Sequence, residues 1–246
     1  MERFLRTELL LGKKVLSVLR ESRVTIIGLG AVGSYCLEIL ARAGIGNFTL
    51  ADFDVIRKSN LNRNLLALES TIGMNKTEAA AGRVLNINPA CKVETIAEMI
   101  DGTNIARICA GSGIVIDAID SLGPKAAILS YLTLNNIKAA SSMGAALRKD
   151  VSAVKAGDIL QATSCPLAQR LRKRLKKNGI TSGIPCVFSL EKPLTVSTAG
   201  SKEEETFKRG RQRQTLGSMP TVPAAFGVTL AGLALGILLK TEEKDR

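Results

Sequence analysis

Histidine is absent from this chain of 246 residues. The absence excludes catalytic triads and general bases built on imidazole, together with every zinc site that needs a histidine ligand. Any chemistry must therefore use carboxylates, amines, guanidinium groups, amides or a thiol. The five cysteines include no Cys-x-x-Cys pair, and the first residues lack a signal-peptide pattern. We therefore expect reduced thiols and a cytoplasmic location.

Aromatic residues are scarce as well, at 3% of the sequence with no tryptophan, whereas 46% of the residues are hydrophobic. Small and β-branched aliphatic side chains are abundant, which is typical of parallel strands covered by helices on both faces. A chain of this length can bury a full core as one domain with an appendage. The composition thus indicates an α/β fold.

Acidic residues are the minority charge. The chain carries 34 Lys and Arg against 22 Asp and Glu, which gives a formal net charge of +12. A positive field of this size attracts polyanions such as RNA, nucleotides or anionic lipid. The charge alone does not choose among these partners.

Strand and helix patterns alternate along the first part of the chain. Short apolar runs that end in turns predict strands, and helical spacing closed by Gly or Pro predicts helices. The expected order is strand 24–27, helix 31–43, strand 48–52, helix 76–88, strand 93–96, strand 114–117, a helix that opens at Pro124, and strand 138–142. Repeated βα units of this kind predict a doubly wound, mostly parallel sheet of Rossmann type.

We expect three regions. Residues 1–22 predict an amphipathic helical entry, and residues 23–145 predict a nucleotide-binding domain. Residues 146–246 add a C-terminal region with a basic helix at 167–177, a strand at 187–190, a mobile polar loop at 193–217 and a helix at 224–240. The last helix is apolar and about as long as the shortest membrane-spanning helices. Its small residues favour packing on the same fold over a span or an interfacial anchor.

A glycine-rich loop follows the first strand. Its three glycines, Gly28, Gly30 and Gly33, let backbone N–H groups approach a phosphate, and the N-terminus of the next helix adds positive potential. Asp52 ends the second strand, where a carboxylate can hold ribose hydroxyls. These residues alone favour an NAD-type fold, and hence an NAD(P)-dependent oxidoreductase.

The segment 50–64 changes this interpretation. It contains the strand end Asp52-Phe53-Asp54 and the turn Ser59-Asn60-Leu61-Asn62-Arg63, and farther on come Gly73-Met74-Asn75-Lys76 and Asp117-Ala118-Ile119-Asp120. In this order the motifs resemble those of the ubiquitin-activating-like adenylating enzymes. The resemblance covers most of residues 3–145. It implies that the nucleotide is ATP and that Asp52 and Asp54 belong to its site.

Adenylation expels pyrophosphate from the α-phosphorus, so it needs charge neutralisation and positioning more than a proton-transfer pair. Arg63 and Lys76 would supply positive charge to the phosphates, Asn60 a hydrogen-bond donor, and Asp120 a hard oxygen ligand for Mg²⁺. Each has a simpler alternative: a surface cation for Arg63 or Lys76, a turn former for Asn60 and a helix cap for Asp120. Their joint occurrence in order favours the functional interpretation.

The resemblance extends to three more residues. Arg3 lies where relatives supply an additional arginine across a dimer interface, with Arg6 as the alternative, and a homodimer is expected because relatives are usually symmetric dimers. Cys186 is a candidate because related enzymes that handle ubiquitin-like carriers use a cysteine for thioester or persulfide chemistry. A buried structural thiol is the equal alternative. A sulfur-relay system with a cysteine desulfurase is an open partner for such a thiol.

Motifs in the second half narrow the family. They are Pro124-Lys125-Ala126-Ala127, Asp158-Ile159, Pro166-Leu167-Ala168, Arg172-Lys173-Arg174-Leu175-Lys176, Cys186-Val187-Phe188-Ser189-Leu190-Glu191 and Gly217-Ser218-Met219-Pro220-Thr221-Val222. With them the chain is similar, over nearly its whole length, to the family of tRNA threonylcarbamoyladenosine dehydratases. The resemblance implies ATP-dependent adenylation of the threonylcarbamoyl carboxylate at adenosine 37 of a tRNA, followed by cyclisation.

Such a substrate gives the positive charge a use. Six cations crowd the basic helix and four more crowd the polar loop, and both groups are candidate contacts for the tRNA backbone: Arg170, Arg172, Lys173, Arg174, Lys176, Lys177, and Lys208, Arg209, Arg211, Arg213. The alternatives are a solvated helix face for the first group and a disordered linker for the second.

Other functions stay open beside this one. An activator of a ubiquitin-like sulfur-carrier protein would share the ATP site, but such relatives usually carry two Cys-x-x-Cys pairs, and this chain has none. A nicotinamide-dependent oxidoreductase leaves Arg63 and Lys76 unexplained. A non-enzymatic RNA-binding or sulfur-relay protein with a degenerate nucleotide fold would not need Asn60 and Asp120 intact.

Overall fold

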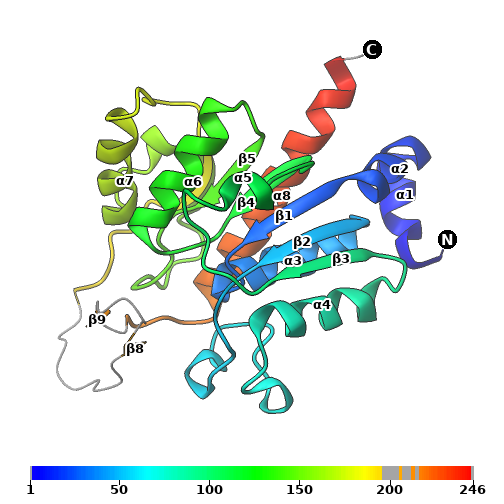
Figure 1. Ribbon diagram of the computed structural model, residues 1–246, viewed down its shortest axis with the longest axis horizontal. Coiled ribbons are helices and arrows are strands. Elements are labelled where there is room, and N and C mark those ends of the chain that lie inside the picture. Colours follow the sequence, from blue (N-terminus) through cyan, green and yellow to red (C-terminus); the bar gives the residue numbers. More distant parts are fainter. Residues whose placement is uncertain (1, 196–204, 207–211, 214–215, 245–246) are drawn as a thin grey trace.

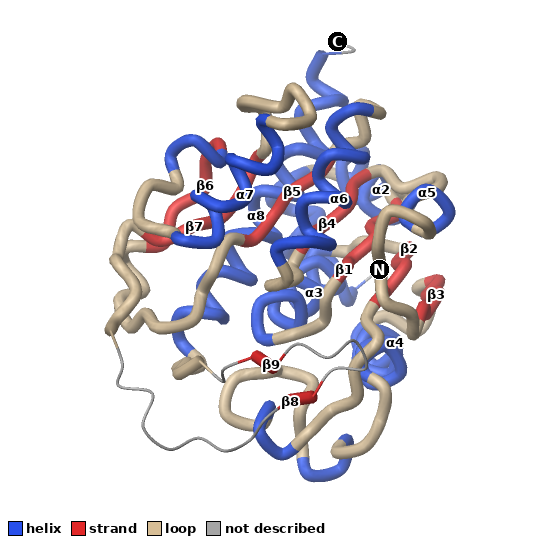
Figure 2. The backbone as a smooth tube through the Cα atoms, turned by 60° about the vertical axis from the view of Figure 1, so that its left-hand side comes forward, coloured by secondary structure: helices blue, strands red, loops and turns tan. Residues whose placement is uncertain are grey.

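The computed structural model describes residues 2–195, 205–206, 212–213 and 216–244. Seven strands form one sheet in the order β3-β2-β1-β4-β5-β7-β6. The bounds are β1 (Arg23–Ile27), β2 (Asn47–Ala51), β3 (Lys92–Ile96), β4 (Ile114–Asp117), β5 (Ala139–Ser142), β6 (Val154–Asp158) and β7 (Pro185–Ser189). Only β6 runs antiparallel to its neighbour. Figure 2 shows β3 at one edge of the sheet and β6 with β7 at the other.

Helices cover both faces of this sheet (Figure 1). They are η1 (Glu2–Phe4), α1 (Leu5–Leu11), α2 (Lys13–Glu21), α3 (Ala31–Ala43), η2 (Lys58–Asn60), η3 (Glu69–Thr71), α4 (Lys76–Ile87), α5 (Ile105–Ile108), α6 (Leu122–Leu134), η4 (Ile159–Gln161), α7 (Pro166–Lys176) and α8 (Thr221–Lys244). A second, two-stranded sheet pairs β8 (Glu205–Thr206) antiparallel with β9 (Gln212–Arg213). The predicted doubly wound α/β fold of Rossmann type, with added C-terminal strands and helices, is confirmed.

The side chains of β1 divide the core between the two faces. Ile26 packs in a cluster with residues of α3, α4 and α8, whereas Ile27 packs in another cluster with residues of α5 and α6. This alternation follows from the two-residue period of a strand. Because both faces are buried, the strand reads as a continuous apolar run rather than as an alternation of polar and apolar residues.

The predicted element bounds hold best where turn residues define them. Helix α3 spans the expected residues and ends at Gly44, which adopts the left-handed conformation that favours glycine. The helical entry is divided at Gly12, which has a φ of 87° between α1 and α2. Helix α6 begins at Leu122 rather than at Pro124, because proline is tolerated throughout the first turn of a helix.

Helix α8 packs against α3 on one face of the sheet. A Cβ atom added at Gly227 would lie 2.5 Å from Tyr35 Cβ and 2.6 Å from Val32 O, so the α8 and α3 backbones approach closely. Phe226 and Leu230 of α8 are fully buried in the same cluster. By length and composition α8 could also cross a membrane, since residues 221–240 have a mean hydropathy of 2.1.

Candidate active site

The phosphate loop joins β1 to α3, and its three glycines are required for different reasons. Gly28 has a φ of 93°, and its N–H donates to the carbonyl of Ala51 at 2.8 Å. A Cβ atom at Gly33 would lie 1.9 Å from Gly28 O, so no side chain fits there. A Cβ atom at Gly30, in contrast, would meet no described atom within 4 Å beyond its chain neighbours. Packing thus explains Gly33, whereas Gly30 leaves room for a ligand to approach the backbone.

Helix α3 begins directly at this opening. Gly30 is its N-cap and provides no side-chain cap for the first turn. The first N–H groups of a helix lack intrahelical acceptors and carry the positive end of the helix dipole. The loop therefore offers backbone donors and positive potential to a phosphate group.

Asp52 lies just after β2 and is buried against the loop. Its Oδ2 accepts a hydrogen bond of 2.7 Å from the N–H of Leu29, and its Oδ1 accepts one of 2.9 Å from the N–H of Asp54. Each carboxylate oxygen can accept one further hydrogen bond, which leaves capacity for ribose hydroxyls. Burial raises the pKa of Asp52, and the nearby Lys76 ammonium opposes that rise.

Lys76 is the first residue of α4 and reaches back to the strand end. Its Nζ lies 2.8 Å from Asp54 Oδ2, and its side chain is nine-tenths buried. The N–H of Lys76 also donates to Asp54 O at 3.0 Å. Two parts of the chain that the sequence motifs predicted to act together are thus joined by both backbone and side chain.

The turn that carries Asn60 and Arg63 is ordered by its own side chains. Asn60 Oδ1 accepts a hydrogen bond of 3.1 Å from the N–H of Arg57. Arg63 Nη1 donates to Ser59 O at 2.7 Å and to Asn62 Oδ1 at 2.9 Å. Asn60 is therefore a turn former in this structure, and its amide N–H₂ still remains as a potential donor.

The same turn is tied to two distant segments. Asn62 Nδ2 donates to Ser218 O at 3.1 Å, which places the residues before α8 beside the turn. Asn64, which the sequence analysis did not single out, donates from Nδ2 to Leu29 O at 3.0 Å and accepts at Oδ1 from the N–H of Leu66. Asn64 is buried and couples the Arg63 turn to the phosphate loop. Its position directly after the recognised turn was the available sequence signal.

Asp120 lies in the loop between β4 and α6. Residues Ala118 and Ile119 of this loop lie over Gly28, since a Cβ added at Gly28 would be 2.9 Å from each. Asp120 is exposed there. Among the described residues, no group of three or more His, Cys, Asp or Glu side chains is arranged to hold a metal. An ion at Asp120 would therefore complete its ligand set with phosphate oxygens and water, as Mg²⁺ commonly does.

Cys186 and Arg3 lie away from the phosphate loop of the same chain. Cys186 is on β7, which is separated from β1 by β4 and β5, and it is buried among apolar residues that include Leu171 and Phe188. Burial raises the pKa of its thiol to about 12, so the thiol is protonated at neutral pH. A structural thiol fits this environment better than a nucleophile does.

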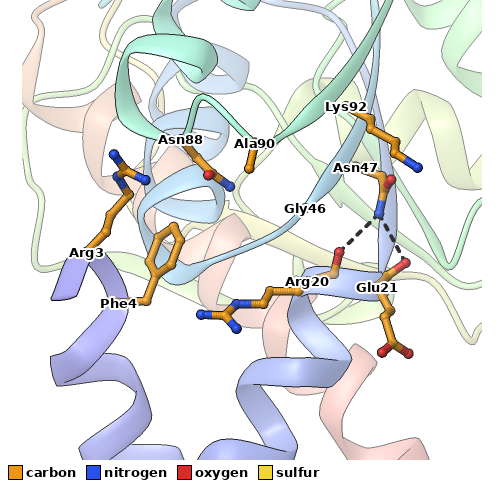
Figure 3. Close-up of a pocket in the computed structure, with 9 residues that line it drawn as sticks. All are labelled: Arg3, Phe4, Arg20, Glu21, Gly46, Asn47, Asn88, Ala90 and Lys92. Carbon is orange, nitrogen blue, oxygen red and sulfur yellow. Dashed lines mark hydrogen bonds between the residues drawn. The ribbon is translucent and has the colours of Figure 1, made fainter. Parts of the chain in front are cut away.

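Arg3 lines a cavity of about 590 Å³ at the amino ends of the strands (Figure 3). Other lining residues are Arg20, at the end of α2, and Lys92, at the start of β3. Asn47 spans one side of it by donating to the carbonyls of Arg20 and Glu21. The phosphate loop follows the carboxyl end of β1. Arg3, at the amino ends of the strands, therefore lies on the opposite side of the sheet from the nucleotide site of its own chain. Arg6 is an exposed residue of the adjacent helix α1.

Five of the six cations of the basic helix are exposed: Arg170, Lys173, Arg174, Lys176 and Lys177. The sixth, Arg172, donates from Nη1 to the carbonyls of Ile159 and Ala162, so it holds η4 in place. The second cationic group, Lys208, Arg209, Arg211 and Arg213, lies outside the residues whose side chains the structure describes, as does most of the polar loop 193–217.

Comparisons with known proteins agree with this arrangement. The model of the ThiF family matches residues 3–246. The tRNA threonylcarbamoyladenosine dehydratase of Escherichia coli is 34% identical over 95% of this chain and 92% of its own length. The enzyme of that name from Bacillus subtilis is 33% identical over 100% of this chain and 98% of its own. The crystal structure of the E. coli dehydratase in complex with ATP has a TM-score of 0.87 and 32% identity, and the match covers 100% of this chain and 97% of that one.

Proposed function

Because the chain belongs to the ThiF family, we propose that it is an ATP-dependent dehydratase that acts on the threonylcarbamoyladenosine of tRNA. The observation that carries this proposal is the extent of the similarity. The similarity includes the basic helix, β7 and α8 as well as the nucleotide-binding half. The two bacterial relatives, which bear the same name, match this chain over nearly their full length. The nucleotide site alone would fit any adenylating enzyme.

The reaction begins with attack of the threonylcarbamoyl carboxylate on the α-phosphorus of ATP, with pyrophosphate as the leaving group. The amides at Gly30 and the start of α3 bind phosphate oxygens, and Arg63 and Lys76 neutralise the charge that moves to the leaving group. Lys76 starts from its ion pair with Asp54, which holds the ammonium in place before ATP arrives. Asp52 is placed to hold the ribose.

Magnesium fits the remaining part of the site. Asp120 is an exposed carboxylate in a loop that touches the phosphate loop, and Mg²⁺ is usually held by one or two carboxylates together with substrate phosphates. When bound, the ion would neutralise phosphate charge during the loss of pyrophosphate. Asp120 would be its protein ligand.

Ring closure follows from the acyl adenylate. A nucleophile within the threonylcarbamoyl adenosine attacks the activated carbonyl, AMP leaves, and the net change in the tRNA is the loss of one water. Because the nucleophile and carbonyl belong to one molecule, geometry supplies a high effective concentration. The step needs no histidine base and no enzyme thiol, which agrees with the missing histidine and the buried Cys186.

A homodimer would explain the position of Arg3. Arg3 lies at the amino ends of the strands, whereas the nucleotide site of its own chain lies at their carboxyl ends. Arg3, or Arg6 in its place, could therefore contact ATP only across an interface. Helix α1 beside it exposes Leu9 and Leu10 at 77% and 81%, an apolar surface suited to a second copy. A sulfur-relay partner with a cysteine desulfurase gains no support from the buried thiols.

The tRNA is expected to lie along α7. Four exposed cations lie on this short helix and a fifth, Lys177, is its C-cap. Clustered Lys and Arg on one element suit a phosphate backbone. An enzyme with this substrate works in the cytoplasm. The packing of α8 on α3 and the sheet makes membrane contact the less favoured alternative.

Pyrophosphate release tests the proposal directly. ATP is supplied with threonylcarbamoylated tRNA, with tRNA that lacks the modification, or with a carrier protein that ends in Gly-Gly. We expect pyrophosphate, and a tRNA mass lower by one water, only with the modified tRNA. Release with the carrier protein alone would instead identify a sulfur-carrier activator and would reject the dehydratase.

A further inference from the structure

A fully buried ion pair lies beneath the nucleotide site. Lys125 of α6 and Asp117 at the end of β4 both have side chains with 0% exposure, and Lys125 Nζ lies 2.5 Å from Asp117 Oδ2. Ser141 of β5 completes the group, since its Oγ donates to Asp117 Oδ2 at 2.7 Å and accepts from Lys125 Nζ at 3.2 Å. Removing charged groups from water costs free energy, and replacing a buried ion pair by apolar residues of similar volume is often neutral or even stabilising. The fold therefore gains little stability from this choice of residues.

The group is connected to the loop that carries Asp120. Asp117 Oδ1 accepts a hydrogen bond of 3.3 Å from the N–H of Ile119, one residue before Asp120. Ala118, the next residue after Asp117, donates its N–H to Ile27 O at 2.8 Å. Together these bonds set the path of the chain from β4 across Gly28, where Ile119 touches the phosphate loop.

The two oxygens of Asp117 have separate partners. Oδ2 is held from below by Lys125 and Ser141, and Oδ1 is thereby turned towards the Ile119 amide. If an apolar side chain replaced Lys125, the Asp117 carboxylate would be left buried without a counterion. It would then rotate or take up water, and either change weakens its hold on Ile119.

We propose that Lys125 is a positioning residue for adenylation: through Asp117 and Ser141 it fixes the loop that presents Asp120 to Mg²⁺ and the phosphates. This inference rests on the proposed function, because it takes ATP with Mg²⁺ as the ligand. Lys125 itself is enclosed and contacts neither. Residues behind a metal ligand commonly govern affinity for the metal by fixing the ligand's orientation.

The test separates nucleotide affinity from the part of it that depends on Mg²⁺. Calorimetry with the purified full chain gives the dissociation constants of AMP without metal and of ATP with and without Mg²⁺. In Lys125→Met we expect the gain in ATP affinity on adding Mg²⁺ to fall by at least about tenfold. The affinity for AMP should stay within about twofold of wild type, since Asp52 and Gly30 hold that part of the ligand.

Two companions keep the experiment decisive. Ser141→Ala retains the ion pair and removes the two hydrogen bonds of the Ser141 hydroxyl, so it should show a smaller loss in the same direction. It decides the matter if Lys125→Met fails to fold. Leu19→Ala truncates a buried side chain of α2 near the amino ends of the strands, away from the nucleotide site. It serves as the control for general destabilisation.

The inference is overturned if the Mg²⁺-dependent gain is intact in the folded variants, or if Leu19→Ala loses it to the same degree. It also falls if AMP and ATP affinities decline together, which would make Lys125 merely structural. No tRNA enters these assays, so failure of the chain to dehydrate tRNA leaves the result readable. Absence of Mg²⁺-dependent ATP binding in the wild type would reject both the inference and the proposed function.

Discussion

The side-chain amide of Asn64 donates a hydrogen bond of 3.0 Å to the carbonyl of Leu29 in the phosphate loop. The N–H of Leu29 donates to Asp52 at the same time. Side chains of the site therefore bind both the N–H and the carbonyl of Leu29. Leu29 itself is fully buried. The loop is thus organised before ATP binds, which lowers the entropic cost of ordering it around the phosphates.

Replacing Asn64 by Ala should destabilise the chain and weaken ATP binding. The change leaves the Leu29 carbonyl and the Leu66 N–H buried without partners, at a cost of about 1–3 kcal/mol each. Asn64→Asp is the matched variant: it keeps the acceptor for Leu66 and replaces the donor to Leu29 by a carboxylate oxygen that faces the Leu29 carbonyl. Thermal denaturation and ATP titration of both proteins measure the two effects. Unchanged ATP affinity in Asn64→Asp would show that the contact with Leu29 is irrelevant to the site.

Alanine at Gly33 and at Gly30 should have opposite effects. Gly33→Ala places a Cβ 1.9 Å from Gly28 O, so we expect loss of at least about 3 kcal/mol of stability or failure to fold. Gly30→Ala meets no described atom within 4 Å beyond its neighbours and should keep the wild-type melting temperature. Its methyl group would obstruct the phosphates and cost about 10- to 100-fold in ATP affinity, equal to about 1.4–2.8 kcal/mol. Wild-type ATP affinity in Gly30→Ala would move the phosphates away from this loop.

Arg63→Ala should abolish adenylation while the chain still retains tRNA. Within the described residues the guanidinium bonds to its own turn, through Ser59 O and Asn62 Oδ1, so its loss should leave the fold intact. Loss of one phosphate-binding charge from the transition state typically lowers the rate by about 10²–10³. Pyrophosphate release and a filter-binding assay with modified tRNA report the two properties. Joint loss of both would make Arg63 a structural residue of the turn.

The thiol of Cys186 predicts a pH dependence of stability. Burial raises its pKa from an ordinary value of 9.0 to about 12, and the protonated thiol is the form that the folded chain favours. Its contribution to stability is therefore complete below pH 9 and is lost as the pH rises from 9 towards 12. Cys186→Ala should show a shallower decline of the unfolding free energy over that range, and it should keep full activity at pH 7. A large loss of activity in this variant would restore a chemical role for the thiol.

Two glycines of α8 offer a matched pair for its contact with α3. Gly227→Ala would place a Cβ 2.5 Å from Tyr35 Cβ, so it should push the phosphate-loop helix and lower both stability and ATP affinity. Gly232→Ala has open space around it within the described structure and should stabilise the chain by about 0.5–1 kcal/mol. Melting curves and ATP titrations distinguish the two. Equal behaviour of both variants would contradict the close α3–α8 contact.

Local signals explain what the sequence could predict. The strand, glycine loop and helix from β1 to the end of α3 are specified by neighbouring residues, and Gly44 marks the helix end by its left-handed conformation. The four-residue helix α5 and the strand β6 were missed. Residues 154–158 of β6 contain Lys, Gly and Asp and alternate weakly, because β6 is an edge strand and gains its place through pairing with β7.

The candidate site divides in the same way. Residues that a ligand would touch, such as Arg63 and Lys76, occur in motifs with a fixed order along the chain. Residues that hold those motifs together are found only when the fold brings distant segments into contact. Lys125, Asp117 and Ser141 come from a helix and two strands, and no pattern along the sequence indicates that a lysine in an apolar helix ends in a buried ion pair.

The contact between α8 and α3 also bears on how the chain is made. Helix α3 belongs to the first βαβ unit to leave the ribosome, yet part of its apolar surface is covered by α8, which is translated long afterwards. Until α8 has emerged, the phosphate-loop helix keeps that surface in contact with water or with a chaperone. We therefore expect stable nucleotide binding to be acquired only near the end of synthesis, and a nascent chain stalled before residue 221 to bind ATP more weakly than the finished chain.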